Sequence, residues 1–413
     1  MSSKLISGKP EAVGMSGERL ARLDRHLAER YIGPGALPCA LVLAHRRGKT
    51  VHISVQGHAD RERQRPLQED ALFRIYSMTK PLTSIAFMML VEEGAVALDD
   101  PVTRFIPEWS HLGVFVGGTD GAFLTKPPAR PMQMVDLLRH TSGLTYGFQQ
   151  RSNVDAVYRA KDIGVPGGKT SLDGMIAELG RLPLEFSPGE AWNYSVSTDV
   201  VGYLVGRISG QPFERFLKER ILDPLGMSDT DFQVPAGQER RLTACYSAAP
   251  AGAPTLQDDP AKSAYLKPPV LVSGGGGLVS TAADYLTFCR MLANGGELGG
   301  HRLVGPKTLE LMTSNHLPGG RDLSSMSRSM FSEATNEGVG FGLGFATTTN
   351  PTRTLLQGSV GDFYWGGAAG TYFWVDPVEE LIVVFMTQLF GTPQSLRREL
   401  RTMVYSAITE ANA

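Results

Sequence analysis

The chain has 413 residues, of which 42% are hydrophobic and 20% are charged, as is usual for a folded globular protein. Its 40 Lys and Arg residues nearly balance 42 Asp and Glu residues, and the net charge of −2 excludes bulk electrostatic attraction to nucleic acid or to an anionic membrane. The chain has three cysteines without CxxC spacing, which argues against a disulfide framework. It has no long apolar run, so we expect neither a signal peptide nor a transmembrane helix. We therefore expect a cytoplasmic protein with neither a nucleic-acid nor a membrane partner.

Three segments near the N-terminus have clear periodicity. Leucines at helical spacing predict an amphipathic helix over residues 14–30. Two apolar runs, residues 39–45 and 51–57, flank a basic turn and predict a β-hairpin. A largely apolar helix is predicted to follow Ser77 and to end at Gly94.

The middle of the chain, residues 95–250, shows little strand pattern. It predicts short helices over residues 132–140, 197–210 and 211–227, separated by loops rich in proline and glycine. This part of the chain therefore reads as a helical insertion.

The pattern changes again after residue 270. A run of four glycines, residues 274–277, precedes a predicted helix that stops at Gly295. Residues 370–377 and 380–389 predict two strands joined by a short turn, and residues 392–409 predict a final helix.

These elements predict an α+β fold in which an antiparallel sheet flanked by helices packs against a mostly helical domain. We expect residues 1–85 and 255–413 to form a discontinuous α/β domain, residues 86–254 to form the helical domain, and the active site to lie between them. Residues 318–338 are polar and rich in glycine and serine, and they predict a long mobile loop at the rim of the active site.

Ser77 and Lys80 lie three residues apart at the predicted start of a helix, so their side chains share one face. A serine there is often only an N-cap, and a lysine is often only a solvated charge. However, the helix dipole disfavours a cation in the first turn. A lysine beside a hydroxyl can assist removal of the hydroxyl proton, as in the S-x-x-K arrangement of acyl-transferring serine enzymes.

Two further motifs follow in chain order, Tyr194-Ser195-Val196 and Trp365-Gly366-Gly367. The order S-x-x-K, Y-x-N and K-T-G resembles the serine β-lactamase and penicillin-binding-protein superfamily, and supporting phrases such as "LLRHTSGLTYG" extend the resemblance over residues 10–389. The asparagine of the second motif and the lysine of the third are both missing. A W-G-G third motif beside a lone tyrosine resembles the family VIII carboxylesterases, which have a class C β-lactamase-like fold.

The resemblance implies roles for particular residues. Ser77 would be the nucleophile, and Lys80 with Tyr194 would take its proton. The backbone N–H groups of Ser77 and Ala368 would form the oxyanion hole. Because tyrosine titrates near 10, we expect Lys80 to help Tyr194 act as a base near neutral pH.

The third motif is expected to contact the substrate. Trp365 replaces a lysine that faces the substrate carboxylate in the lactamases, so an apolar indole there predicts neutral substrates. Gly366 and Gly367 would let the strand lie flat against the substrate. Tyr146 is a further candidate for the pocket lining, whereas His140 is expected only to fix its loop by hydrogen bonds.

The leading hypothesis is a hydrolase of small to medium neutral esters. A β-lactamase or D-amino-acid peptidase, an acyltransferase to an alcohol acceptor, and a non-catalytic binding protein stay as alternatives. No metal site or cofactor is expected, because the histidines are scattered. The chain has no G-x-S-x-G motif, which disfavours an α/β-hydrolase. The natural substrate and the oligomeric state cannot be predicted.

Overall fold

Both ends of the chain contribute strands to one antiparallel sheet. The computed structural model describes residues 5–249, 252–328 and 337–412. The eight strands follow the order β12-β13-β14-β15-β16-β1-β2-β3, and their bounds are β1 Cys39–Arg46, β2 Lys49–Asp60, β3 Arg65–Pro66, β12 Val339–Phe341, β13 Ala346–Thr348, β14 Phe363–Gly366, β15 Tyr372–Asp376 and β16 Leu381–Met386. The predicted α+β class with an antiparallel sheet is therefore confirmed.

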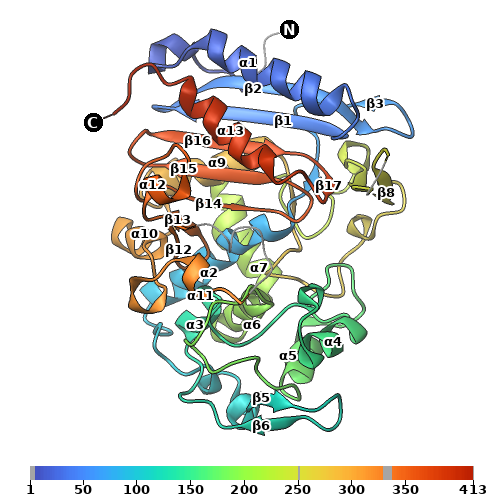
Figure 1. Ribbon diagram of the computed structural model, residues 1–413, viewed down its shortest axis with the longest axis vertical. Coiled ribbons are helices and arrows are strands. Elements are labelled where there is room, and N and C mark those ends of the chain that lie inside the picture. The colour runs from blue at the N-terminus through green and yellow to red at the C-terminus, as the bar shows by residue number, and fades with distance from the viewer. Residues whose placement is uncertain (1–4, 250–251, 329–336, 413) are drawn as a thin grey trace.

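Helices cover both faces of this sheet. Helices α1 (Gly17–Leu27) and α13 (Ser395–Ser406) pack against each other on one face, and α9 (Ala282–Ala293) packs on β15 and β16 from the other (Figure 1). Strands β1, β15 and β16 are buried at every residue. Burial on both faces explains why their sequences read as continuous apolar runs without alternation.

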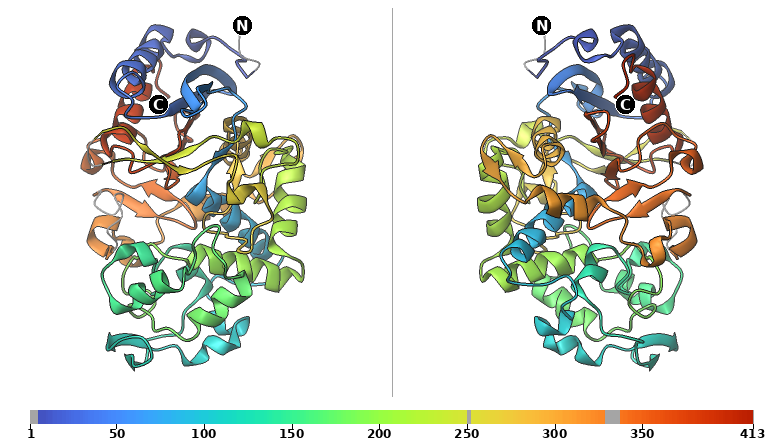
Figure 2. Two further views of the ribbon diagram at one scale, coloured as in Figure 1. Left: turned by 90° about the vertical axis from the view of Figure 1, so that its right-hand side faces the viewer. Right: turned by 90° about the vertical axis from the view of Figure 1, so that its left-hand side faces the viewer.

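The second half of the molecule is mainly helical and lies below the sheet in both side views (Figure 2). Its helices are α2 Thr79–Glu92, α3 Met134–Leu138, α4 Asn153–Ala160, α5 Leu172–Leu179, α6 Ser197–Ser209, α7 Phe213–Leu217 and α8 Asp223–Leu225. Helix α2 is buried on all sides over its first twelve residues and packs against α6. The exact domain boundaries at residues 85 and 255 stay a prediction.

Several short elements connect these halves. Their bounds are β4 Phe73–Arg74, β5 Val114–Gly117, β6 Leu124–Lys126, β7 Cys245–Ser247, β8 Thr255–Asp258, β9 Val279–Ser280, β10 Glu297–Leu298, β11 His301–Arg302, α10 Pro306–Thr313, α11 Leu323–Met326, α12 Pro351–Thr354 and β17 Leu389–Phe390. The most relevant pairings are β4 with β9 and β17 with β7, because they fix the chain on either side of the site.

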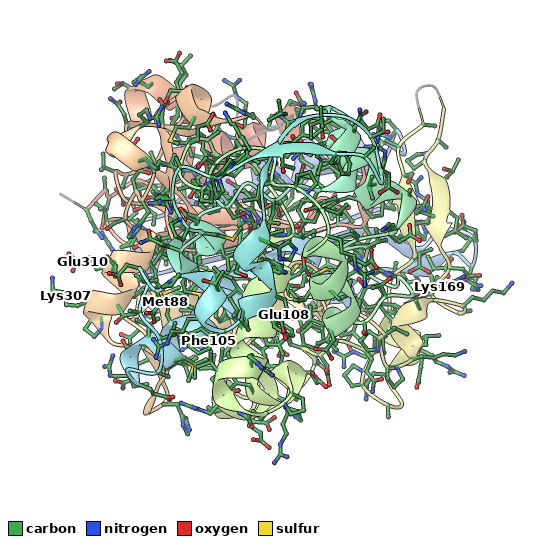
Figure 3. The ribbon with its side chains drawn as sticks, turned by 90° about the horizontal axis from the view of Figure 1, so that it is seen from below. Met88, Phe105, Glu108, Lys169, Lys307 and Glu310 are labelled. Carbon is green, nitrogen blue, oxygen red and sulfur yellow. The ribbon has the colours of Figure 1, made fainter. Side chains whose placement is uncertain are left out.

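Two segments after α9 bear on the site. Lys307-Thr308-Leu309 matches the first two residues of a K-T-G motif. However, Lys307 lies on α10 with 88% of its side chain exposed, and it projects outward with its ion-pair partner Glu310 (Figure 3). The predicted mobile loop over residues 318–338 contains the short helix α11 in its described part, and residues 329–336 lie outside the described residues. Over the described ranges, none of the helices has the length and apolar character needed to span a bilayer.

Candidate active site

Ser77 lies in a tight turn between a strand and a buried helix. Strand β4 leads into a 3₁₀ turn over Tyr76–Met78, and α2 begins at Thr79. Tyr76 has a φ of 42°, a left-handed conformation that L-residues adopt rarely and that persists where packing enforces it. Its ring packs on Phe390 with centroids 5.2 Å apart. Within the described chain no side chain caps the N-terminus of α2. Ser77 is therefore not an N-cap, which was the alternative role that its sequence position allowed.

Lys80 lies directly beneath Ser77 and is only 1% exposed. Its ammonium donates to Ser77 Oγ at 3.2 Å, to the Tyr146 hydroxyl at 3.1 Å and to the Gly275 carbonyl at 2.7 Å. The same nitrogen lies 4.6 Å from the ring centroid of Tyr194. All three donors of the lysine are thereby directed at named acceptors.

Burial acts in opposite directions on the two predicted proton carriers. It lowers the pKa of Lys80 to about 7, with the nearby Asp199 opposing the shift. Burial raises the pKa of Tyr194, and hydrogen bonds from Ser77 and Trp365 only partly offset this. Near neutral pH, Lys80 is therefore partly uncharged while the phenol of Tyr194 keeps its proton, which differs from the expectation of a tyrosine base.

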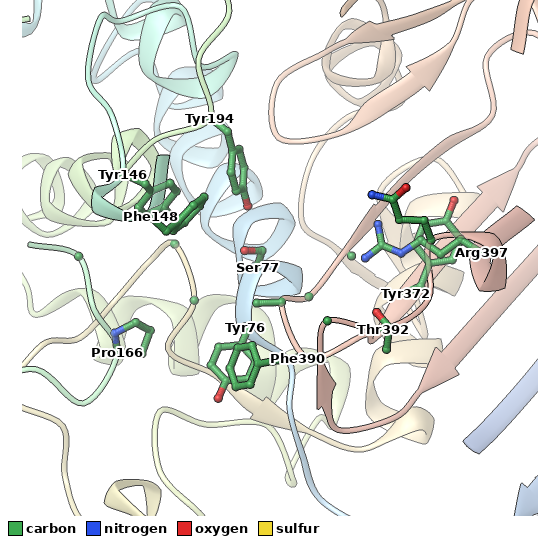
Figure 4. Close-up of a pocket in the computed structure, with 18 of the residues that line it drawn as sticks. Tyr76, Ser77, Tyr146, Phe148, Pro166, Tyr194, Tyr372, Phe390, Thr392 and Arg397 are labelled. Carbon is green, nitrogen blue, oxygen red and sulfur yellow. The ribbon is translucent and has the colours of Figure 1, made fainter. Parts of the chain in front are cut away.

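Tyr194 is held in an aromatic cluster. Its ring centroid lies 4.9 Å from that of His140, 6.0 Å from that of Trp192 and 5.4 Å from that of Trp365. Its hydroxyl points toward Ser77 (Figure 4). His140 is buried, and its Nδ1 lies 3.3 Å from Ser195 Oγ, in keeping with the structural role expected for it.

Trp365, predicted to contact the substrate, is buried and does not line the cavity. Its side chain is 1% exposed, and its Nε1 donates to the Tyr194 hydroxyl at 3.3 Å. It is absent from the cavity wall that its neighbours Gly366 and Gly367 form. The indole therefore contacts Tyr194 directly, and it lies behind the tyrosine instead of in the wall of the cavity.

The two glycines of the third motif are required by packing inside the protein. A Cβ at Gly367 would overlap the Ile75 carbonyl and Thr371 Oγ1, and one at Gly366 would overlap the guanidinium of Arg397. Since Ile75 precedes the turn of Ser77, the glycines allow β14 to approach the nucleophile's segment closely. The sequence analysis expected these glycines to keep the strand flat against the substrate, whereas the contacts that require them are with other parts of the protein.

One cavity of about 1370 Å³ brings the candidates together. Ser77, Tyr194, Gly366, Gly367 and Ala368 all line it, so both predicted oxyanion-hole residues border the same space. On the helical side the wall includes Tyr146 and Phe148, whose rings stack at 4.8 Å, and on the sheet side it includes Tyr372, Thr392 and Arg397 (Figure 4).

Asp199 was not identified from the sequence, although it is buried close to Lys80. Its Oδ1 accepts hydrogen bonds from Ser273 Oγ at 2.5 Å and from the Gly275 backbone at 3.0 Å, and the Gly275 carbonyl in turn accepts from Lys80. In the sequence, Asp199 lies five residues after Tyr194 and resembles the acidic residues that are common in the first turn of a helix.

Comparison with known proteins agrees with this geometry. The beta-lactamase family model matches residues 23–406. The chain belongs to the beta-lactamase family. It is 36% identical to protein Rv1367c of Mycobacterium tuberculosis over 86% of each chain, and 31% identical to esterase EstB of Burkholderia gladioli over 96% of each chain. The structure of EstCE1, a hydrolase with promiscuous acyltransferase activity, aligns with a TM-score of 0.78 at 25% identity, covering 95% of this chain and 99% of that one.

Family membership makes this protein a β-lactamase-like serine hydrolase and confirms the fold that the resemblance implied. The roles of the individual site residues stay predictions. Across the residues described, no group of three or more His, Cys, Asp or Glu side chains is arranged to hold a metal ion.

Proposed function

We propose that the protein is a serine carboxylesterase that forms an acyl-enzyme on Ser77. The observation that carries this proposal is the hydrogen bond of 3.2 Å between the buried Lys80 ammonium and Ser77 Oγ, at the wall of a large cavity. The likeness to esterase EstB supports ester substrates. A non-catalytic binding protein would have no need for a lysine buried against a hydroxyl, because desolvating the ammonium costs free energy.

In the proposed acylation step, uncharged Lys80 accepts the Ser77 proton as Oγ bonds to the ester carbonyl carbon. Negative charge on the carbonyl oxygen would be stabilised by the backbone N–H groups of Ser77 and Ala368. As the carbon–oxygen bond breaks, the Tyr194 hydroxyl gives its proton to the leaving alcohol, and the proton on Lys80 then restores the phenol. In deacylation, water takes the place of Ser77 as the nucleophile and gives its proton to Lys80. Tyr194 then gives its proton to Ser77 Oγ as the acid is released.

The cavity volume of about 1370 Å³ supports the proposal of small to medium esters as substrates, because it leaves room for both halves of such an ester. The sequence predicted neutral esters, but that expectation rested on Trp365 facing the substrate. The absence of the lysine and asparagine of the lactamase motifs still weighs against efficient β-lactam or D-amino-acid peptide hydrolysis.

Acyl transfer to an alcohol is a second candidate function, which the cavity size favours. A space of about 1370 Å³ has room for an acyl group and an acceptor alcohol together. Adding an alcohol during ester hydrolysis should then yield a new ester, and the ratio of new ester to acid measures how acceptor and water partition.

The proposed esterase activity is tested with 4-nitrophenyl esters of increasing acyl length beside a chromogenic cephalosporin. We expect turnover of the esters and little or no turnover of the cephalosporin, and no ester turnover by Ser77→Ala. Faster hydrolysis of the cephalosporin than of every ester would favour a β-lactamase, and no turnover of either would favour a binding protein.

A further inference from the structure

Phe148 contributes an exposed apolar ring to the cavity wall on the helical side of Ser77. It lies in a 3₁₀ turn over Gly147–Gln149, and 58% of the residue is exposed. One face of the ring stacks on Tyr146, with centroids 4.8 Å apart and an interplanar angle of 21°. Figure 4 shows the stacked pair on one side of Ser77 and Thr392 on the other. Because Tyr146 covers one face, the opposite face and the edge of the Phe148 ring supply the exposed area.

The turn that carries Phe148 is fixed on both sides of that residue. The guanidinium of Arg159 donates to the Gly147 carbonyl, and Gln149 Nε2 donates to the backbone carbonyl of Tyr194 at 3.0 Å. An exposed ring that is already fixed loses little conformational freedom when a ligand covers it. The position of Phe148 therefore suits a binding surface better than that of a side chain on a free loop.

A second apolar segment lines the same part of the cavity. Val165 and Pro166 belong to the loop that follows α4, and Val165 is 45% exposed. Gly164 precedes them with a φ of 72°, and a Cβ there would lie 3.7 Å from the Tyr146 ring. The loop thus passes close to the aromatic pair, so apolar groups from two segments border one space.

Pro166 connects this apolar wall to the nucleophile. A Cβ placed on Gly276 would lie 3.5 Å from the Pro166 ring and 3.7 Å from the carbonyl carbon of Tyr76, so both lie within van der Waals reach of the same point. Tyr76 directly precedes Ser77. The apolar wall therefore begins beside the nucleophile, and a group attached to the reacting ester can reach it.

We propose that Phe148, together with Val165 and Pro166, forms an apolar subsite for a flat ring, so that the preferred substrates are esters with an aromatic group in one half. This inference rests on the proposed esterase function and names its substrate class. An aromatic group of the ester would extend the stack of Tyr146 and Phe148 and would remove exposed apolar surface from water. A saturated ring of similar size gains from burial but not from stacking, because it has no π system.

The test compares matched aromatic and saturated esters, with acid release followed at constant pH. Methyl 3-phenylpropanoate against methyl 3-cyclohexylpropanoate places the ring in the acyl half, and benzyl acetate against cyclohexylmethyl acetate places it in the alcohol half. The variants are Phe148→Leu, which removes the ring but keeps an apolar side chain, and Phe148→Tyr, which keeps the ring. Leu124→Ala is the control, because Leu124 is an exposed apolar residue of β6 that does not line the cavity.

We expect wild type to prefer the phenyl ester in at least one pair, which identifies the half that reaches Phe148. For that pair, Phe148→Leu should lower the ratio of kcat/KM for the phenyl ester to kcat/KM for the cyclohexyl ester about 3- to 10-fold, mainly through the KM of the phenyl ester. Phe148→Tyr and Leu124→Ala should keep the ratio of wild type.

The proposal is overturned if wild type prefers the phenyl ester in neither pair, or if Phe148→Leu leaves the ratio unchanged. An equal fall for both esters would mean that the ring only holds Tyr146 in place beside Lys80.

Should Phe148→Leu fail to fold, calorimetry of wild type with unreactive amides decides. The pairs are 3-phenylpropanamide against 3-cyclohexylpropanamide and N-benzylacetamide against N-(cyclohexylmethyl)acetamide. We expect tighter binding of the aromatic amide in at least one pair, and its absence from both pairs overturns the proposal. Because binding needs no turnover, selective binding without hydrolysis of any ester would contradict the proposed esterase function and leave the subsite standing.

Discussion

Lys80 and Tyr194 both adjoin Ser77, and they form one proton-transfer unit in the proposed mechanism. We predict that Lys80→Ala and Tyr194→Phe each lower kcat by several orders of magnitude, and that the double variant is little worse than either. Groups that act as a unit are strongly non-additive. Steady-state kinetics of the three variants measures this, and losses that simply multiply would mean that the two side chains do not share a proton path.

Asp199 is predicted to tune the proton affinity of Lys80. The groups near Lys80 include Ser77, Tyr146, Tyr194, the Gly275 carbonyl, His140 and Asp199. Since the uncharged amine is the proposed base and its pKa is about 7, kcat/KM should rise with pH through about 7. The Asp199 carboxylate favours the charged amine, so Asp199→Asn should lower the pKa of Lys80 and move this rise to lower pH.

The measurement is the pH profile of kcat/KM for a neutral ester. Asp120→Asn, an equal charge change at an exposed turn, should leave the profile unchanged. A shift of the Asp199→Asn profile to higher pH would contradict the electrostatic role, and an unshifted but lower profile would indicate that Asp199 only supports the Gly275 segment.

At the residue scale, spacing alone placed Ser77 beside Lys80, and Tyr194 joined them only through the family resemblance that the three motifs carry. Spacing was insufficient for Trp365, because the side to which a strand residue points depends on the partner strands and not on the motif. Asp199 was missed because its significance comes from contacts with segments far away in the chain.

At the scale of elements, β14 and the turn that carries Ser77 approach each other closely. Gly367→Ala would place a methyl group against the Ile75 carbonyl and Thr371 Oγ1. We predict a loss of about 1–3 kcal/mol of stability together with lower kcat, because the turn must move to admit the methyl group. Urea unfolding and ester kinetics measure the two effects.

The matched control is Gly117→Ala in β5, where no atom lies within 4 Å of the added carbon. It should change neither stability nor kcat appreciably. If Gly367→Ala behaves like this control, the close approach is not needed for the geometry of the site.

Helices and strands with a sustained hydrophobic pattern were predictable from the sequence, whereas very short strands were not. Helices α1, α2, α6, α9 and α13 and strands β1, β2, β15 and β16 follow hydrophobic patterns that run for five to fourteen residues. Strands β7 and β17 have three residues or fewer, and they pair with each other although they lie far apart in the chain. The sequence of such a short strand does not show which distant segment will pair with it.

For the whole molecule, we predict insensitivity to chelators and to reducing agents. The mechanism uses only side chains and backbone, and Cys39, Cys245 and Cys289 are buried and unpaired. Ester hydrolysis in EDTA and in dithiothreitol should match that in plain buffer. A loss in EDTA that a divalent metal restores would reveal a metal site that we have missed. The cytoplasmic location stays a prediction, and the oligomeric state stays open.

The central claim is that Ser77 carries the acyl group, and covalent labelling tests it most directly. The protein is treated with a 4-nitrophenyl alkylphosphonate, digested, and mapped by mass spectrometry, with Ser77→Ala as the control. We predict one adduct, on the peptide that contains Ser77, formed in step with the loss of esterase activity and absent from Ser77→Ala. An adduct on another residue that abolishes activity, or full activity in Ser77→Ala, would contradict the account.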